Sequence, residues 1–213
     1  RSASRRDAMP ARANTLAIRS PFGVSGGDVW VIILCLTLFR ALAKGHQMQA
    51  SRCMMFRSHM DVALSEAQAA ATRGEVPVGA VIVNPAGKVI AQAGNRTREL
   101  HDPTAHAEVL AIRAACTYLG QERLTSHWLY VTLEPCPMCA GLLVHSRIKR
   151  IVYGALDLKT GSAGSVFNIT NTEKLNHQIS VTSGVLAEQC SHLLSAFFKR
   201  RRLEKKAIKQ AAK

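Results

Sequence analysis

The sequence predicts an α/β fold of three layers, in which helices cover both faces of a five-stranded mixed sheet. Five short apolar segments alternate with helical segments after an opening hairpin, and this order is typical of a partly parallel sheet between helices. The chain has 213 residues, of which 47% are hydrophobic, which is enough to form one core of this kind. We find neither an internal repeat nor a second domain.

The first predicted element is an amphipathic helix that starts near Cys53. Apolar residues recur in it at intervals of three and four, which places them on one helical face. These residues are Phe56, Met60, Ala63, Leu64, Ala67, Ala70 and Ala71. Gly74 is a natural end for this helix because glycine readily adopts the left-handed conformation.

A β-hairpin is predicted after this helix. Residues 76–83 and 89–93 are apolar and rich in β-branched side chains, and an Asn-Pro-Ala-Gly turn joins them. A polar loop over residues 95–104 then leads into a second helix over residues 105–119, which Gly120 ends.

Strands and helices alternate in the second half of the chain. Strands are predicted over residues 127–133, 149–153 and 179–182, and helices over residues 136–145 and from 186 to about 205. These elements complete the predicted five strands and the helices on both faces.

Positive charge is concentrated at the two ends of the chain, whose formal net charge is +14. Residues 1–52 carry 8 basic and 2 acidic side chains, and residues 199–213 carry 8 basic and 1 acidic, so the region between is nearly neutral. This distribution indicates an anionic partner, most simply a nucleic acid, although a polyanionic substrate or an acidic membrane surface also fits. A solvated helix end is the alternative interpretation of the C-terminal cluster.

Residues 1–52 differ in composition from the rest and form an N-terminal extension that is disordered, non-native or a targeting segment. The uncharged stretch over residues 29–39 is shorter than the roughly 20 residues of a membrane span, so no membrane insertion is predicted. Arginine- and serine-rich, acid-poor composition is typical of an organelle transit peptide. Residues 53–206 then form the single domain with its basic C-terminal helix, and residues 207–213 a basic tail.

The six cysteines point to metal or catalytic chemistry in a reduced compartment, because the chain is too long and too poor in cysteine to need disulfides. Cys136 and Cys139 form a C-x-x-C pair at the start of a predicted helix, directly after Pro135. Both sulfurs can therefore reach one point, near the positive end of the helix, which favours thiolates. The pair alone also fits a redox site, half of a structural zinc site or two buried thiols.

His106, near the start of an earlier helix, adds a third ligand. One imidazole and two thiolates suit zinc, and three protein ligands leave a fourth position for water, which is typical of a catalytic site. Cys116, ten residues further along the helix, is too distant to join them. With zinc at this place, we expect the Glu108 carboxylate to move a proton from zinc-activated water to a leaving nitrogen. The alternative for Glu108 is a simple acidic residue at a helix start.

The pattern His106-Ala107-Glu108 followed by Pro135-Cys136-Pro137-Met138-Cys139 is the signature of zinc-dependent nucleobase deaminases. The stretches that flank this signature narrow the resemblance to one family of deaminases. They are Glu75-Val76-Pro77-Val78-Gly79-Ala80, Gly94-Asn95-Arg96, His101-Asp102-Pro103-Thr104-Ala105, Thr132-Leu133-Glu134, His145-Ser146-Arg147-Ile148 and Tyr153-Gly154-Ala155. With them, residues 53–206 resemble the bacterial tRNA-specific adenosine deaminases of the cytidine/deoxycytidylate deaminase superfamily.

This resemblance implies a cytidine-deaminase-like fold and a hydrolytic reaction that converts the wobble adenosine of a tRNA anticodon loop to inosine. It implies one zinc ion per subunit, a homodimer, the anticodon stem-loop of tRNA as partner, and a cytoplasmic location unless residues 1–52 direct import into an organelle. Zinc would be held by His106, Cys136 and Cys139, and Glu108 would move protons.

The resemblance also implies substrate contacts. Asn95 would read the flipped base, Val78 would form an apolar wall, the Ala107 backbone would orient the base, and Asp157 would contact a neighbouring sugar. The C-terminal helix would meet the anticodon stem-loop through Phe198, Lys199, Arg200, Arg201 and Arg202. Leu156 departs from the family pattern, in which an arginine is common at this position.

Two other functions remain open from the sequence. The first is a zinc-dependent deaminase of a small base or nucleoside of the guanine or cytosine type, which would not need the basic C-terminal residues. The second is a non-catalytic, zinc-containing RNA-binding protein, which would not need the acid at position 108.

Overall fold

The computed structural model describes residues 56 and 59–212, so the predicted extension over residues 1–52 lies outside the described part, as do Cys35 and Cys53. Residues 59–72 are helical, and Gly74 follows in the left-handed conformation with a φ of 78°. The other elements are β1 (Gly79–Val83), β2 (Val89–Gly94), α2 (Ala107–Leu119), β3 (Trp128–Leu133), α3 (Pro137–His145), β4 (Arg150–Ala155), β5 (Ser180–Thr182) and α4 (Ala187–Ala211).

The five strands form one mixed sheet in the order β2-β1-β3-β4-β5. The β1 strand pairs antiparallel with β2 and β3, whereas β3, β4 and β5 run parallel. Helix α3 connects the parallel strands β3 and β4, so the carboxyl end of β3 and the amino terminus of α3 adjoin. The predicted five-stranded mixed sheet is confirmed.

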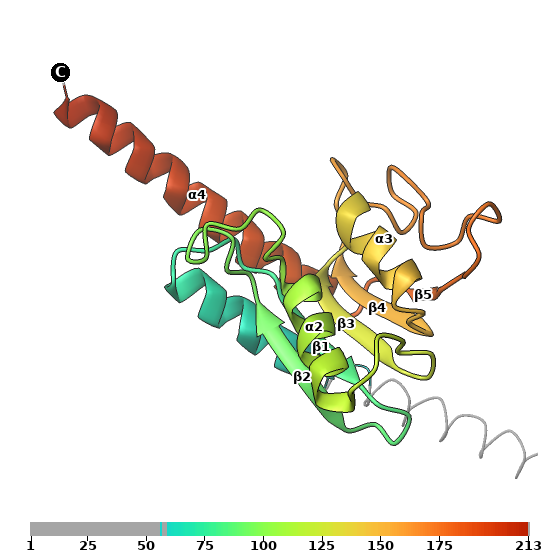
Figure 1. The fold of residues 1–213 in the computed structure, drawn as a ribbon. Helices are drawn as coiled ribbons and strands as arrows, with labels where there is room; N and C mark the ends of the chain where they lie inside the picture. The colour runs from blue at the N-terminus through green and yellow to red at the C-terminus, as the bar shows by residue number, and fades with distance from the viewer. Residues whose placement is uncertain (1–55, 57–58, 213) are drawn as a thin grey trace, which may run out of the picture. The chain divides into compact units, whose positions relative to one another are not determined.

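Helices cover both faces of this sheet (Figure 1). One core lies under α2 and α3 and includes Ile82, Leu129 and Ile151. The opposite core lies under the helix at residues 59–72 and α4, and it includes Val81 and Tyr130. Successive residues of β1 and β3 thus point to opposite faces and are buried on both, which gives the three predicted layers.

The helix at residues 59–72 lies directly against β1. A Cβ atom at Gly79 would lie 1.9 Å from the carbonyl oxygen of Ala63, so only glycine fits at this position. This close approach fixes the helix end, and the loop that follows it, relative to the sheet.

The first strand is shorter than predicted. Strand β1 begins at Gly79, not at Val76, so the predicted strand over residues 76–83 is wrong at its start. Pro77 has no N–H to donate to a neighbouring strand, and the Val78 N–H donates to the Val76 carbonyl at 2.8 Å in a local turn. The missing N–H of Pro77 and the local turn at Val78 therefore outweigh the strand propensity of these residues.

The last helix is longer than predicted, since α4 continues to Ala211 and not to about Lys205. Residues 206–211 are strong helix formers apart from one isoleucine, so nothing ends the helix earlier. Most of the predicted basic tail over residues 207–213 is therefore helical. Within residues 56 and 59–212, no helix combines the length and hydropathy that crossing a membrane requires.

Candidate active site

Two helix amino termini meet at the predicted metal ligands. His106 is the N-cap of α2 and Cys136 is the N-cap of α3, and both have extended backbones with ψ angles of 152° and 172°. Neither side chain makes a capping hydrogen bond, so both are available as ligands. Cys139 lies in the first turn of α3. The positive ends of both helices favour negative charge at this point.

The three ligand atoms have the spacing that zinc requires. His106 Nδ1 lies 3.8 Å from Cys136 Sγ and 3.6 Å from Cys139 Sγ, and the three atoms lie within 4.8 Å of one another. A tetrahedral zinc with bonds of about 2.3 Å to sulfur and about 2.0 Å to nitrogen would place its nitrogen about 3.5 Å from each sulfur. His106, Cys136 and Cys139 thus fit a zinc ion with three protein ligands.

Thiol electrostatics also suit a metal site. A hydrogen bond with Cys139, together with His106, lowers the pKa of Cys136 to about 4. The same bond and burial raise the pKa of Cys139, and the bond to Cys136 raises the pKa of His106. One sulfur is therefore already a thiolate at neutral pH, which is the form that binds metal.

Glu108 is buried beside this group. The residue is 3% exposed, and its Oε2 atom has no hydrogen-bond partner among the described residues. Burial raises the pKa of this carboxyl, against smaller lowering effects from nearby groups that include His106 and Cys139. A buried carboxylate oxygen without a partner is rare unless a ligand or water is to occupy its empty side.

Asn95 is joined to the start of α2. Its Oδ1 accepts the Ala107 N–H at 2.8 Å, and its own backbone N–H donates to the Val78 carbonyl at 3.1 Å. Asn95 and Val78 are 6% and 5% exposed. The structure therefore brings Asn95, Val78 and Ala107 together beside His106. The Ala107 N–H is already committed to Asn95, while the Asn95 amide nitrogen donates to no described residue.

Asp157 lies in the loop after β4, next to the exposed Leu156. Its carboxylate accepts the N–H groups of Lys159 and Thr160 at 2.9 and 3.2 Å and the Thr160 hydroxyl at 2.6 Å. Burial raises the pKa of Asp157, but these hydrogen bonds outweigh it, so the pKa is lowered. Asp157 is thus a charged residue that shapes its own loop.

The predicted RNA-contacting residues of α4 make no hydrogen bond or ion pair with the ligand group in the described part of the chain. Phe198 is 44% exposed beside the buried Phe197. Arg200 and Arg201 pair with Glu204 at 3.6 and 2.7 Å. Lys199 and Arg202 have no ion pair with a described residue.

Two buried glutamates were not singled out as site residues from the sequence. Glu134 is 2% exposed and accepts the N–H groups of Ala163 and Ser165 at 2.9 and 3.0 Å, and that of Asp157 at 3.2 Å. Glu75 is 1% exposed and holds the loop before α2. Glu134 lies between Leu133 and Pro135, and Glu75 comes directly before the apolar residues 76–78, so an acid beside apolar residues is the sequence signal for this burial.

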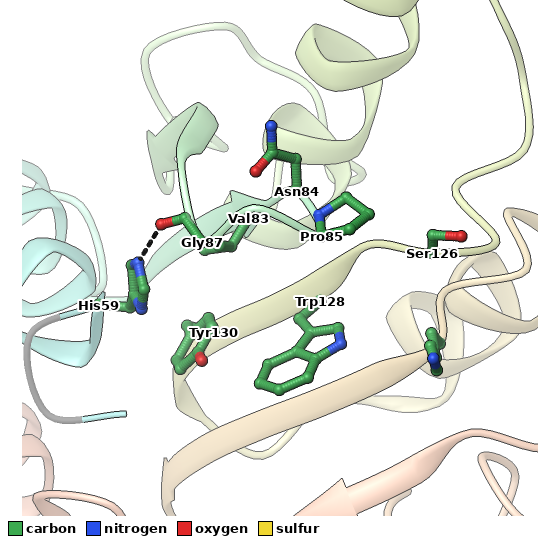
Figure 2. A pocket seen from close by; sticks show the side chains of 9 residues that line it. His59, Val83, Asn84, Pro85, Gly87, Ser126, Trp128 and Tyr130 are labelled. Atoms are coloured by element: carbon green, nitrogen blue, oxygen red, sulfur yellow. Dashed lines mark hydrogen bonds between the residues drawn. The ribbon is translucent and has the colours of Figure 1, made fainter. Parts of the chain in front are cut away.

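A cavity of about 230 Å³ lies at the end of β3 that is far from the metal ligands, next to the turn that joins β1 and β2 (Figure 2). Trp128, Tyr130 and His59 line it, and His59 Nε2 lies 2.9 Å from the Gly87 carbonyl. None of the predicted ligands borders this cavity. The Tyr130 hydroxyl is sealed from solvent and has no hydrogen-bond partner among residues 56 and 59–212.

Known proteins that resemble this chain belong to the class that the ligand group indicates. Residues 55–155 match the family model described as the cytidine and deoxycytidylate deaminase zinc-binding region. A solved guanine deaminase from Nitrosomonas europaea is 25% identical with a TM-score of 0.57, over 66% of this chain and 83% of that one. Fold and ligand group together define a zinc-dependent deaminase.

Closer relatives identify the branch. The tRNA-specific adenosine deaminase of Haemophilus influenzae is 51% identical over 72% of this chain and 89% of its own length. Its counterpart from Bacillus subtilis is 49% identical over 71% and 94%. A structure from a study of A-to-I editing by tRNA:A34 deaminases is 49% identical with a TM-score of 0.62, over 64% of this chain and 99% of that one. The chain belongs to the tRNA-specific adenosine deaminase family.

Proposed function

We propose that this chain hydrolyses the wobble adenosine of a tRNA anticodon loop to inosine. One observation carries the proposal from the structure: the buried Glu108, whose Oε2 atom has no hydrogen-bond partner among the described residues, lies beside a group of three zinc-ligand atoms. Family membership supports the choice of substrate, because the relatives of 49–51% identity are tRNA-specific adenosine deaminases.

Glu108 moves protons in this reaction. His106, Cys136 and Cys139 would hold zinc, which would supply a water molecule activated at neutral pH. The Glu108 carboxylate accepts a proton from that water and delivers it to the departing nitrogen. A C–O bond forms at C6 of the adenine, the C–N bond breaks, and ammonia leaves. Burial keeps other water from the carboxylate.

Asn95 and Val78 bind the base. The Asn95 amide nitrogen has no partner among the described residues and can donate to a ring nitrogen of adenine, while Oδ1 stays bonded to Ala107. Val78 adds an apolar surface. An anticodon loop presents its bases unpaired, so extruding one requires little free energy.

The remaining RNA contacts come from the loop after β4 and from α4. Asp157 contacts a sugar, and Phe198 with Lys199, Arg200, Arg201 and Arg202 contacts the stem-loop. Exposed apolar side chains in the loop after β4, Leu158 and Phe167 among them, support a homodimer with this loop at the interface. The cytoplasmic location stays a prediction.

Two variants test the assignment. Glu108→Ala should retain one zinc per chain, measured by metal analysis, and form no detectable inosine on an anticodon stem-loop. Glu122→Ala, which removes an exposed acid beyond the far end of α2, is the matched control and should be fully active. Activity that survives Glu108→Ala would overturn the mechanism.

The small-base alternative has a different outcome. Deleting residues 199–213 should weaken action on the stem-loop and leave any turnover of free guanine or cytosine unchanged. Free-base turnover as fast as turnover of the stem-loop would favour that alternative, whose reaction class is that of a guanine deaminase of 25% identity. One zinc per chain without any deamination would favour the non-catalytic alternative.

A further inference from the structure

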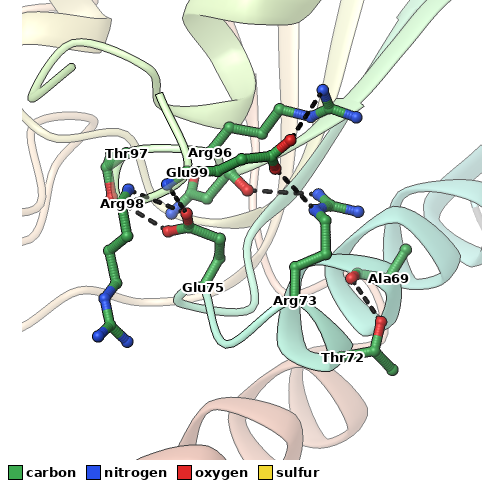
Figure 3. A network of polar contacts seen from close by, with 9 residues as sticks. Ala69, Thr72, Arg73, Glu75, Arg96, Thr97, Arg98 and Glu99 are labelled. Carbon is green, nitrogen blue, oxygen red and sulfur yellow. Dashed lines mark hydrogen bonds and ion pairs between the residues drawn. The ribbon is translucent and has the colours of Figure 1, made fainter. Parts of the chain in front are cut away.

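Glu75 is a buried carboxylate that binds backbone and hydroxyl groups of one loop. It follows the helix at residues 59–72 and is 1% exposed. Its Oε1 accepts the N–H groups of Arg98 and Glu99 at 2.9 and 2.8 Å, and its Oε2 accepts the Thr97 hydroxyl at 3.2 Å (Figure 3). A buried charge is tolerated only when it is satisfied in this way.

The loop that Glu75 holds connects two residues of the candidate site. It starts at Asn95, directly after β2, and ends at His106, directly before α2. Glu75 binds the middle of this segment, which contains neither helix nor strand. The anchor itself is fixed, because Gly79 a few residues later packs against the helix at residues 59–72.

Arg73 reinforces the same connection. Its Nη2 donates to the Asn95 carbonyl at 3.3 Å, and its Nε pairs with Glu99 at 3.4 Å (Figure 3). Glu99 also pairs with Arg96 at 3.5 Å. Since Glu99 is 41% exposed in its side chain, these ion pairs are weak, and the buried bonds of Glu75 are the stronger restraint.

We propose that Glu75 is a positioning residue for deamination, which holds the loop over residues 95–105 so that the Asn95 amide faces the base. This inference rests on the proposed function of the site. Glu75 is sealed from solvent and does not touch substrate, so it acts through Asn95. Misplacing a binding group by about 1 Å can lower a rate by up to roughly a hundredfold.

Three variants isolate this role. Glu75→Ala leaves two backbone N–H groups and one hydroxyl without their acceptor. Glu75→Gln keeps an oxygen for both N–H groups, and its amide can donate to the Thr97 hydroxyl, which also accepts. Glu99→Ala is the matched control, because it removes only the exposed ion pairs of the same loop.

The experiment measures zinc content, inosine formation on an anticodon stem-loop, and amide hydrogen exchange of residues 97–100. Glu75→Ala should keep one zinc, lose roughly tenfold to a hundredfold in kcat/KM, and exchange faster at Arg98 and Glu99. Glu75→Gln should recover most of the activity, and Glu99→Ala should stay within about twofold of wild type. The double variant Glu75→Ala/Asn95→Ala should be no less active than Asn95→Ala alone.

Four results would overturn the proposal: wild-type kinetics in Glu75→Ala, loss of its zinc, unchanged exchange at Arg98 and Glu99, or losses that multiply in the double variant. If the wild-type protein itself forms no inosine, the proposed function fails instead. Hydrogen exchange in Glu75→Ala and Glu99→Ala then still decides whether Glu75 holds the loop.

Discussion

The side chain of Asn95 caps a helix to which it does not belong. Its Oδ1 accepts the N–H of Ala107, the first residue of α2, at 2.8 Å. The N-cap side chain of a helix normally accepts an N–H of the second or third helical residue, but here the N-cap is His106, whose imidazole faces two sulfurs and makes no capping bond. Asn95 thus supplies an acceptor to this amino terminus from outside the helix, while the His106 side chain faces the two sulfurs.

The Asn95 amide has two separable functions: its oxygen accepts the Ala107 N–H, and its nitrogen is proposed to donate to the base. Asn95→Asp keeps an acceptor for Ala107 and loses the donor, so it should fold with wild-type stability and deaminate far more slowly than the wild type, though still measurably. Asn95→Ala loses both and should also be destabilised by about 1 kcal/mol. Urea unfolding and inosine formation measure the two effects. Equal stability of the two variants would contradict the capping role.

A second prediction tests the close packing of Gly161 against Glu134. A Cβ at Gly161 would lie 2.4 Å from Glu134 Oε2 and 2.5 Å from the Asp157 carbonyl. Gly161→Ala should therefore cost about 1–3 kcal/mol and displace the loop that carries Asp157. Gly141→Ala in α3 meets no atom within 4 Å and should stabilise the protein by about 0.5–1 kcal/mol. Urea unfolding distinguishes them, and similar changes in both would refute the packing argument.

Zinc affinity should rise with pH. Binding requires two thiolates and a neutral imidazole. At neutral pH Cys136 is already deprotonated, because its pKa is lowered to about 4, whereas the raised pKa values of Cys139 and His106 favour their protonated forms. Uptake of zinc should thus release about one to two protons. Calorimetry in buffers of different ionisation enthalpy measures this number, and affinity that is independent of pH would contradict it.

Salt should weaken binding of the anticodon stem-loop. Lys199 and Arg202 have no ion pair among the described residues, so replacing both with glutamine should lower the slope of log affinity against log salt. The decrease should be up to about 0.7 for each phosphate that these two side chains neutralise in the wild-type complex. Lys88 and Lys149, exposed near the other end of the sheet, provide the matched double control. If both double variants show the same slope of log affinity against log salt, Lys199 and Arg202 do not contact RNA phosphates.

Local chemistry made most of the fold predictable from sequence. Apolar periodicity placed every helix and strand, because side chains at fixed spacing share one face. Boundaries were less accurate. Strand β1 starts late because Pro77 has no N–H and Val78 bonds to Val76 in a local turn, and α4 continues because no residue before Ala211 stops it.

Two short motifs sufficed to predict the candidate chemistry, because they place His106 and Glu108 at the start of one helix and Cys136 and Cys139 at the start of another. The residues that support this site became evident only from the packed chain. Glu75, Asn95 and Glu134 act through partners 12 to 31 residues away, with Asn95 bonded to Ala107 and Glu134 to Ser165. Such bonds form only when the packed core brings distant loops together, since no local pattern specifies which backbone N–H a buried carboxylate will meet.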